Sequence, residues 1–428
     1  MSSTDKNTAK HRGFRKIKRF VVDYDPQGIK LEYFDSNLGD KCKDLQIPEI
    51  THETDVSKIA DELAQQSKLI TPAKKVELTF LLQRLQVARD TDKSFSLLKE
   101  VKEHSDVVTS VVLGRSSKYF ISSSQDKTCK IWDLETGELT QTLEGHEDII
   151  SALAISENGD VIASGSHDNT CKLWKTETAE CVHTLEGHND HILCLSFNSS
   201  NVLLATGSSD STAKIWNIHS GREVFTFSDH TDHVVTLTFD PDGKHLVTGS
   251  HDKNLLVFEL KEGSCVHKLS GHEAEVTKVL YSPDGKQIIS ASKDKTVKLW
   301  DSSSEQCIAT VQTDGEVTDM NFDPKGQHLA VAFTDGTAKV FKIETQEIVA
   351  ELSGHKQAIS KIVFNPQGDK ILTASLDRTA RLWNPQTGES LQVLEGHPDE
   401  ITCCQFDYIG NSIVTGCKDG SCVIWQQI

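Results

Sequence analysis

Hydrophobic and polar positions alternate in short segments from about residue 95 to the end of the chain. Residues 188–227 show the pattern, with alternating runs at 192–197, 203–208, 212–216 and 223–227 separated by polar turns. Such alternation, bounded by Gly, Asn, Asp and Ser, predicts β-strands joined by tight turns. The first three runs are the more apolar, which predicts three strands covered on both faces and one outer strand.

A large aromatic residue ends the third predicted strand of every such unit. These aromatics recur every 41 or 42 residues at Trp132, Trp174, Trp216, Phe258, Trp300, Phe341, Trp383 and Trp425. The series includes all six tryptophans of the protein. A repeat of this length predicts a propeller blade, a four-stranded sheet that is stable only between neighbours. The series therefore predicts eight blades.

The last repeat contains only three predicted strands, since the chain ends three residues after Trp425. An alternating segment at 95–101 precedes the first repeat and has no partner strands of its own. Pairing this segment with the last blade completes eight sheets and leaves the ring without a free edge. We therefore expect residues 91–428 to form an all-β, eight-bladed propeller closed by strand 95–101.

The first ninety residues follow other patterns. Residues 1–20 are rich in Lys and Arg and predict a basic, flexible leader. Alternating apolar residues at 20–24 and 29–33 flank an Asp-Pro-Gln-Gly turn and predict a β-hairpin.

Two helices are expected after the hairpin. The first covers residues 55–66, and the second starts at Thr71-Pro72, an N-cap hydroxyl followed by Pro at the first helical position. Leu78, Leu81, Leu82 and Leu85 share one face of the second helix. We expect residues 21–90 to form a small α+β domain.

Composition restricts the partners. A net charge of −18 and a pI near 5.4 argue against a general nucleic-acid or anionic-membrane binder. The sequence contains no long apolar run that could span a membrane and no apolar segment near Met1. We therefore expect a cytoplasmic protein without a membrane span or a secretory signal.

Cys129, Cys171 and Cys422 each stand three residues before an aromatic of the 42-residue series, where other repeats carry Ala or Val. This alternation predicts small buried side chains at these positions. No Cys-x-x-Cys pair occurs, and we expect no metal and no cofactor.

Polar residues also recur at fixed places in the repeats: a His before the first strand, a Ser or Thr on the second, and an Asp in the next turn. With the Trp, these motifs resemble the WD-repeat family, and the resemblance implies that the four residues form a buried hydrogen-bonded tetrad. Complete sets include His146, Ser164, Asp168 and Trp174; His188, Thr206, Asp210 and Trp216; and His397, Thr415, Asp419 and Trp425. The fourth repeat has Phe258 for Trp, and the sixth retains only Asp335.

The tetrads contain the groups of a hydrolase triad, yet they recur in seven repeats and most of their hydroxyls are paired with an indole. We therefore expect a structural role and no catalytic residue.

In WD-repeat proteins the residue before the turn Asp and the third residue after the tetrad His usually face the upper rim. The resemblance thus implies partner-binding residues at Ile149, His167, His191, His233, His251, Glu275, Lys293, Leu376, Glu400 and Lys418. The four histidines among them predict either a rim that gains charge near pH 6.5 or scattered surface histidines.

The segment from Tyr24 to Tyr33, the helix around residues 81–86 and the eight blades together resemble the outer-dynein-arm transport adaptors of the WD-repeat family. The resemblance implies a non-enzymatic, monomeric adaptor that links preassembled outer-arm dynein to an intraflagellar transport complex B subunit. It also implies a location in the cytoplasm, the cilium and the basal body region, and partner contacts at Tyr24, Tyr33, Leu81 and Arg84. Neither nucleic acid nor membrane is an expected partner.

A ubiquitin-ligase substrate receptor, or another cytosolic scaffold, is the alternative. Such receptors often carry Trp-Asp-x-Arg, whereas Trp132-Asp133 is followed here by Leu134-Glu135. That difference favours the adaptor.

Overall fold

The computed structural model describes residues 15–24, 27–35, 39–45, 47–48, 50, 54–67, 69–87 and 94–428. The chain divides into two compact units, Met1–Asp92 and Lys93–Ile428.

The first unit is a three-stranded antiparallel sheet with two helices. Its elements are β1 (Arg15–Tyr24), β2 (Gln27–Asp35), β3 (Gly39–Leu45), α1 (Val56–Gln66) and α2 (Pro72–Val87). The sheet order is β1-β2-β3, so a third strand extends the predicted hairpin. Residues 41–44 of β3 are all exposed and Leu45 is buried, so these residues show no apolar alternation that would predict a strand.

Strand β1 begins inside the segment that we expected to be a leader. Ile17 and Phe20 are both buried in the unit's core although they lie three residues apart. The register of β1 against β2 shifts between Ile17 and Arg19, and such a bulge turns both side chains inward. Residues 15–20 of the predicted leader therefore belong to a strand, and residues 1–14 lie outside the described part of the chain.

Both helices begin after a capping side chain, and the cap at Thr71 was expected from the sequence. Asp55 Oδ1 accepts hydrogen bonds from the backbone N–H groups of Ser57 and Lys58 at 3.0 and 3.2 Å. Thr71 Oγ1 accepts from the backbone of Lys74 at 3.4 Å. The buried residues of the core around the two helices all belong to this unit.

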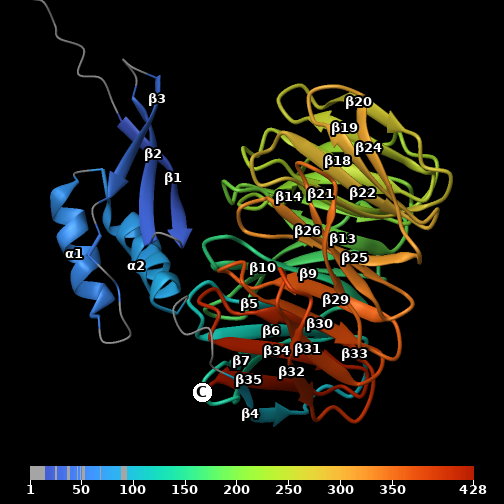
Figure 1. Cartoon of the computed structure of the whole chain (residues 1–428). Coiled ribbons are helices and arrows are strands. Elements are labelled where there is room, and N and C mark those ends of the chain that lie inside the picture. Colours follow the sequence, from blue (N-terminus) through green and yellow to red (C-terminus); the bar gives the residue numbers. More distant parts are fainter. Residues whose placement is uncertain are drawn as a thin grey trace, which may run out of the picture. The chain divides into compact units, whose positions relative to one another are not determined.

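The second unit consists of eight four-stranded antiparallel sheets, and the predicted eight-bladed propeller is confirmed. Figure 1 shows these sheets as successive blades that follow the colour order of the chain. The strands of blades one to four are β5 (Val108–Leu113), β6 (Tyr119–Ser124), β7 (Cys129–Asp133), β8 (Leu139–Leu143); β9 (Ile150–Ile155), β10 (Val161–Ser166), β11 (Cys171–Lys175), β12 (Cys181–Leu185); β13 (Ile192–Phe197), β14 (Leu203–Ser208), β15 (Ala213–Asn217), β16 (Arg222–Phe227); and β17 (Val234–Phe239), β18 (His245–Ser250), β19 (Asn254–Glu259), β20 (Ser264–Ser270). Those of blades five to eight are β21 (Val276–Tyr281), β22 (Gln287–Ser292), β23 (Thr296–Asp301), β24 (Cys307–Gln312); β25 (Val317–Phe322), β26 (His328–Phe333), β27 (Ala338–Lys342), β28 (Ile348–Leu352); β29 (Ile359–Phe364), β30 (Ile371–Ser375), β31 (Thr379–Trp383), β32 (Ser390–Glu395); and β33 (Ile401–Phe406), β34 (Ser412–Cys417), β35 (Cys422–Gln427), β4 (Phe95–Val101).

Strand β4 supplies the outer strand of blade eight. It pairs antiparallel with β35, Val101 opposite Cys422 and Phe95 opposite Gln427, and Figure 1 shows the teal β4 beside the red β35. The ring of Phe95 meets that of Phe406 edge-on at 6.2 Å. Backbone pairing and apolar packing thus join strands more than 300 residues apart in the sequence.

The large aromatic residues that recur every 41 or 42 residues, here called the ladder aromatics, lie at the boundaries between blades. Each packs against a residue of the previous blade's outer strand. Leu185 packs with Trp216, and Leu269 packs with Trp300. At blade four, Phe227 replaces the leucine and stacks on Phe258 at 4.0 Å between ring centroids, filling the space that a tryptophan would occupy. A smaller aromatic is thus compensated by a larger neighbour at that boundary.

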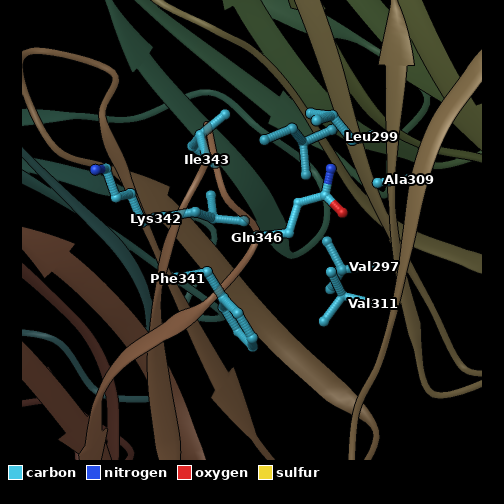
Figure 2. A pocket seen from close by; sticks show the side chains of 10 residues that line it. Val297, Leu299, Ala309, Val311, Phe341, Lys342, Ile343 and Gln346 are labelled. Carbon is cyan, nitrogen blue, oxygen red and sulfur yellow. The ribbon is translucent and has the colours of Figure 1, made fainter.

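The boundary between blades five and six has no such compensation. Val311 stands where most outer strands carry leucine, and Phe341 stands in place of tryptophan. A cavity of about 30 Å³ lies there, lined by both side chains, with Val297, Leu299 and Gln346 among its other walls (Figure 2). Because Val311 and Phe341 are smaller than the residues at most other boundaries, they leave a hollow at the half-buried outer part of this one.

Candidate functional site

The tetrads fix the loops that build the upper rim of the propeller. In blade three, His188 contacts Asp210 through Nδ1 at 2.9 Å and Thr206 through Nε2 at 2.7 Å. Trp216 donates its indole N–H to the same Thr206 hydroxyl at 2.9 Å. The Thr206 hydroxyl thus has partners on both sides and belongs to a fully buried residue. These contacts hold each loop against its blade and leave the hydroxyl no access to a substrate.

Four other blades repeat this geometry with nearly the same distances. Their tetrads are His104, Ser122, Asp126 and Trp132; His146, Ser164, Asp168 and Trp174; His272, Ser290, Asp294 and Trp300; and His355, Thr373, Asp377 and Trp383. Burial lowers the pKa of His146, His272 and His355 although the neighbouring aspartate opposes that shift. The neutral imidazole is therefore the favoured form of these three histidines.

Blades four and six depart from the pattern. In blade four, His230 still contacts Thr248 and Asp252 at 2.8 Å each, and the Thr248 hydroxyl also reaches the backbone oxygen of Leu256 at 3.4 Å. In blade six, Val331 is fully buried at the hydroxyl position, and the exposed Asp335 binds the backbone and hydroxyl of Thr337. Blade six has therefore exchanged its polar network for apolar packing.

The tetrad of blade eight is open. His397 contacts Thr415 at 2.6 Å, but its buried Nδ1 has no partner. Asp419 binds Lys102 at 2.7 Å instead, from the loop that follows β4. Burial lowers the pKa of His397 to about 4. Burial opposes ionisation of Asp419, but hydrogen bonds from Lys102 and Ser421 outweigh it and lower the pKa of that carboxyl.

The identity of residue 398 accounts for the open tetrad. In closed blades the residue after the tetrad histidine donates its backbone N–H to the aspartate, as Glu273 does to Asp294 at 2.9 Å and Lys356 to Asp377 at 2.9 Å. Blade eight has Pro398 at this place, and proline has no N–H. Asp419 therefore lacks one of the donors that hold its counterparts beside the histidine.

The residues predicted to face the rim lie side by side. In every blade the residue before the turn aspartate donates its backbone N–H to the third residue after the tetrad histidine, or to its equivalent in blade six. The pairs that contain predicted residues are His167 to Ile149, Ser209 to His191, His251 to His233, Lys293 to Glu275, Leu376 to Ala358 and Lys418 to Glu400, at 2.8–3.0 Å. The same backbone hydrogen bond thus joins these two positions in each blade, and we call the set of these positions around the ring the upper rim.

The chemistry of the upper rim changes around the ring. Glu275 forms an ion pair with Lys293 in blade five, and Glu400 forms one with Lys418 at 2.8 Å in blade eight. Ile149 and Leu376 are half-buried apolar positions in blades two and seven. The upper rim therefore offers isolated apolar side chains between paired charges, a composition suited to protein contacts.

Histidines dominate the rim of blades two to four. His167 stacks on His191 with 4.3 Å between ring centroids, and burial together with the charge of His191 lowers the pKa of His167. His233 meets His251 nearly at right angles, at 5.5 Å. The sequence suggested scattered surface histidines as one possibility, but the structure pairs all four.

The predicted contacts in the first unit have a different character. Tyr33 and Leu81 pack against its hydrophobic core, half-buried. The side chains of Tyr24 and Arg84 lie outside the described part of the chain. Tyr33 and Leu81 therefore contribute first to the stability of the unit.

One charged cluster was not foreseen from the sequence. Lys278 and Lys361 approach the two carboxylate oxygens of Asp319 at 3.2 and 3.3 Å, from the innermost strands of blades five, seven and six. All three occupy the sixth position after the tetrad histidine or its equivalent, where other blades carry small or hydroxyl side chains. A comparison of that single column across the repeats would have found it.

Cys129, Cys171 and Cys422 are buried, as their alternation with Ala and Val predicts. Within the described residues, neither helix is long and apolar enough to cross a membrane.

Two family profiles match the propeller unit. The WD domain, G-beta repeat, matches residues 95–133, 137–175, 179–217 and 388–426. The IFT122 first beta-propeller matches residues 204–386, which include the blades that carry Phe258 and Phe341.

Individual relatives are similar over a shorter stretch. Dynein assembly factor with WD repeat domains 1 from Macaca fascicularis is 44% identical over 132 residues, and the protein of that name from Homo sapiens is 43% identical. Each match spans 30% of this chain and 31% of the relative. The crystal structure of the computationally designed Ika8 protein superposes with a TM-score of 0.70 at 28% identity, covering 77% of this chain and 99% of that one. The chain is a member of the WD-repeat family, and it is similar to the dynein assembly factors with WD repeat domains.

Proposed function

We propose that this protein is a non-enzymatic adaptor for outer-arm axonemal dynein, which it links to intraflagellar transport complex B in the cytoplasm and the cilium. The similarity to the dynein assembly factors carries the proposal, because six relatives with that name match 132 residues at 43–44% identity. The match to the IFT122 first beta-propeller supports a protein of the ciliary transport class.

The form of the upper rim supports binding of a protein. Half-buried Ile149 and Leu376 give apolar anchors, and the flanking charged pairs give a polar border. Protein interfaces usually combine a few apolar anchors with such a border. The tetrad hydroxyls lie behind the rim with their partners satisfied, which supports an adaptor over an enzyme.

The first unit supplies a second surface. In β3, residues 41–44 are exposed, and they lie on an edge strand of the sheet β1-β2-β3. An exposed edge strand can pair with an added strand of a partner. We propose that this unit contacts the transport subunit while the rim contacts the dynein cargo, with the protein acting as a monomer.

Capture from extracts of ciliated cells tests both halves. The full chain should retain axonemal dynein chains and complex B subunits, whereas residues 93–428, which keep β4, should retain dynein alone. Leu376→Asp on the upper rim should reduce dynein capture at least tenfold. Lys286→Glu is the matched control, because Lys286 lies in the turn at the opposite end of β22 and is strongly exposed.

Two outcomes would contradict the proposal. Undiminished capture of complex B subunits by residues 93–428 would remove the role of the first unit. Recovery of ubiquitin-ligase subunits without axonemal dynein would replace the adaptor by the substrate-receptor alternative.

A further inference from the structure

Asp232, His233 and His251 gather on the upper rim of blade four. Asp232 and His233 precede β17, and His251 lies in the turn between β18 and β19. Each offers one carboxylate oxygen or ring nitrogen, and these three atoms lie within 4.8 Å of one another. Among the residues that the structure describes, no other set of three His, Cys, Asp or Glu side chains is this close.

The backbone holds the three residues together. His251 donates its N–H to the backbone oxygen of His233 at 3.0 Å, and the hydroxyl of Ser250 donates to the backbone oxygen of Asp232 at 2.8 Å. Asp252, next to His251, is anchored by His230 at 2.8 Å. The loop and the turn are therefore joined on both sides of the cluster, which favours preorganised ligands.

A second hydrogen bond selects the tautomer of His233. Its Nδ1 lies 2.7 Å from the backbone oxygen of Ser209, which can only accept, so Nδ1 carries the proton. The lone pair of a neutral His233 is then on Nε2, which lies 3.8 Å from Asp232 Oδ1. Metal-binding histidines usually donate their other ring N–H to a carbonyl or carboxylate in this way.

The donor set indicates which ion would fit. Two imidazole nitrogens and one carboxylate oxygen suit Zn²⁺ and related divalent transition metals, whereas Mg²⁺ and Ca²⁺ prefer oxygen ligands. Ligands about 2 Å from a tetrahedral zinc lie about 3.4 Å from one another, so small rotations would close the site. The His233 and Asp232 side chains are 45% and 50% exposed, which leaves them room to rotate. Glu275 of blade five interacts electrostatically with both His251 and Asp232 and adds negative charge nearby.

We propose that Asp232, His233 and His251 bind a divalent transition-metal ion, with Zn²⁺ as the best fit. The three side chains are its protein ligands, and the fourth position is open to water or to a donor side chain of a bound protein. The site goes beyond the adaptor function, since the isolated protein binds the metal without dynein or a transport complex.

A second histidine pair, His167 of blade two and His191 of blade three, provides a comparison. His191 Nδ1 lies 2.8 Å from the backbone oxygen of His167, and its Nε2 lies 3.6 Å from Asp190 Oδ1, as in the blade-four cluster. However, His167 and His191 stack with only 26° between their ring planes. Stacked rings direct their lone pairs along parallel planes, so these nitrogens do not converge on one ion.

Isothermal titration of the full-length, tag-free protein with ZnCl₂ at pH 7.5 tests the site. Exposed thiols also bind zinc, so every variant carries serine at Cys42, Cys181, Cys265 and Cys307, the exposed cysteines. We expect one ion per chain with a micromolar dissociation constant. His233→Gln and His251→Gln should each weaken binding at least tenfold, whereas His167→Gln and His191→Gln should change it less than twofold.

The variants alter rim side chains outside the core, and tryptophan fluorescence verifies that each ring is folded. Absence of micromolar zinc binding in the parent protein would overturn the proposal. Retention of the site by the double variant His233→Gln/His251→Gln would overturn it as well, and so would equal losses in the His167→Gln and His191→Gln variants. Cobalt titration adds a signature, because an intense visible absorption that disappears with His233→Gln reports tetrahedral nitrogen and oxygen coordination.

Discussion

At the residue scale, one backbone N–H decides whether a tetrad is closed. Lys356 donates this N–H to Asp377 in blade seven, and Pro398 cannot donate it to Asp419 in blade eight. The Asp419 carboxylate forms an ion pair with Lys102 instead, and the Nδ1 of His397 is buried without a partner. A buried polar atom without a hydrogen bond costs about 1–3 kcal/mol.

Restoring the N–H should close the blade-eight tetrad. In Pro398→Ser, Asp419 regains its backbone donor and returns to His397, so the pKa of His397 should rise from about 4 toward its ordinary value of 6.5. Lys102→Met should shift it in the same direction by releasing Asp419. NMR titration of the His397 ring measures both effects.

The reciprocal variant is Lys356→Pro, which should open the blade-seven tetrad and lower the pKa of His355 further. An unchanged His397 pKa in both blade-eight variants would show that Pro398 does not cause the open geometry.

The sequence predicts residues within one repeat better than contacts between distant segments. The tetrad residues recur at fixed spacing, so their positions follow from the pattern. The ion pair between Lys102 and Asp419 joins segments 317 residues apart and depends on ring closure. Lys278, Asp319 and Lys361 lie about one repeat apart, and each alone resembles an ordinary polar strand residue. A comparison of equivalent positions across the repeats would find this cluster, but no such comparison predicts the ion pair between Lys102 and Asp419.

At the element scale, the stability of a blade depends on its boundary with the previous blade. Phe227 compensates for Phe258, whereas Val311 leaves a cavity beside Phe341. The same aromatic substitution thus has different consequences, because the outer strand of the neighbouring blade differs. Patterns of alternation predict both strands but do not report the volume between them.

Filling the cavity should stabilise the ring. Val311→Leu adds one methylene toward a void of about 30 Å³ and should raise the free energy of unfolding by about 0.7 kcal/mol. Leu269→Val is the matched change at a full boundary, where Leu269 packs on Trp300, and it should cost about 1 kcal/mol. Urea denaturation followed by tryptophan fluorescence measures both. A destabilised Val311→Leu protein would show that the void is not accessible to the added carbon.

Phe341→Trp provides a second comparison at this boundary. An indole would fill more space, but the buried Val331 offers its N–H no hydroxyl acceptor. The gain from the larger buried area and the cost of the unsatisfied N–H should nearly cancel, so the free energy of unfolding should change little. The effect of the aromatic residue at 341 therefore depends on the apolar residue at 331.

At the scale of the whole molecule, the ring accumulates the same electrostatic cost in several blades. Burial lowers the pKa of His146, His272, His355 and His397, so each remains neutral in the folded ring where the unfolded chain takes up a proton. The tetrad aspartates have lowered pKa values, as Asp377 does at about 2, and lose their contribution only near pH 4 and below. The two groups therefore act in separate pH ranges.

The ring should consequently lose stability between pH 6.5 and 4. A histidine whose folded pKa lies below its unfolded value costs nothing at pH 7.5, and its cost appears as the pH falls through 6.5 and is complete near the folded pKa. For His397, a pKa shift from 6.5 to about 4 lowers the free energy of unfolding by about 2 kcal/mol at pH 5, and the other three histidines lower it further.

Urea denaturation followed by tryptophan fluorescence measures this loss. All six tryptophans belong to the propeller, so their fluorescence reports this unit alone. Pro398→Ser should reduce the slope between pH 7.5 and 5 because it raises the pKa of His397, whereas Leu269→Val should shift the whole curve without changing its slope. A free energy of unfolding that stays constant over this range would mean that the tetrad histidines are protonated equally in the folded and unfolded states.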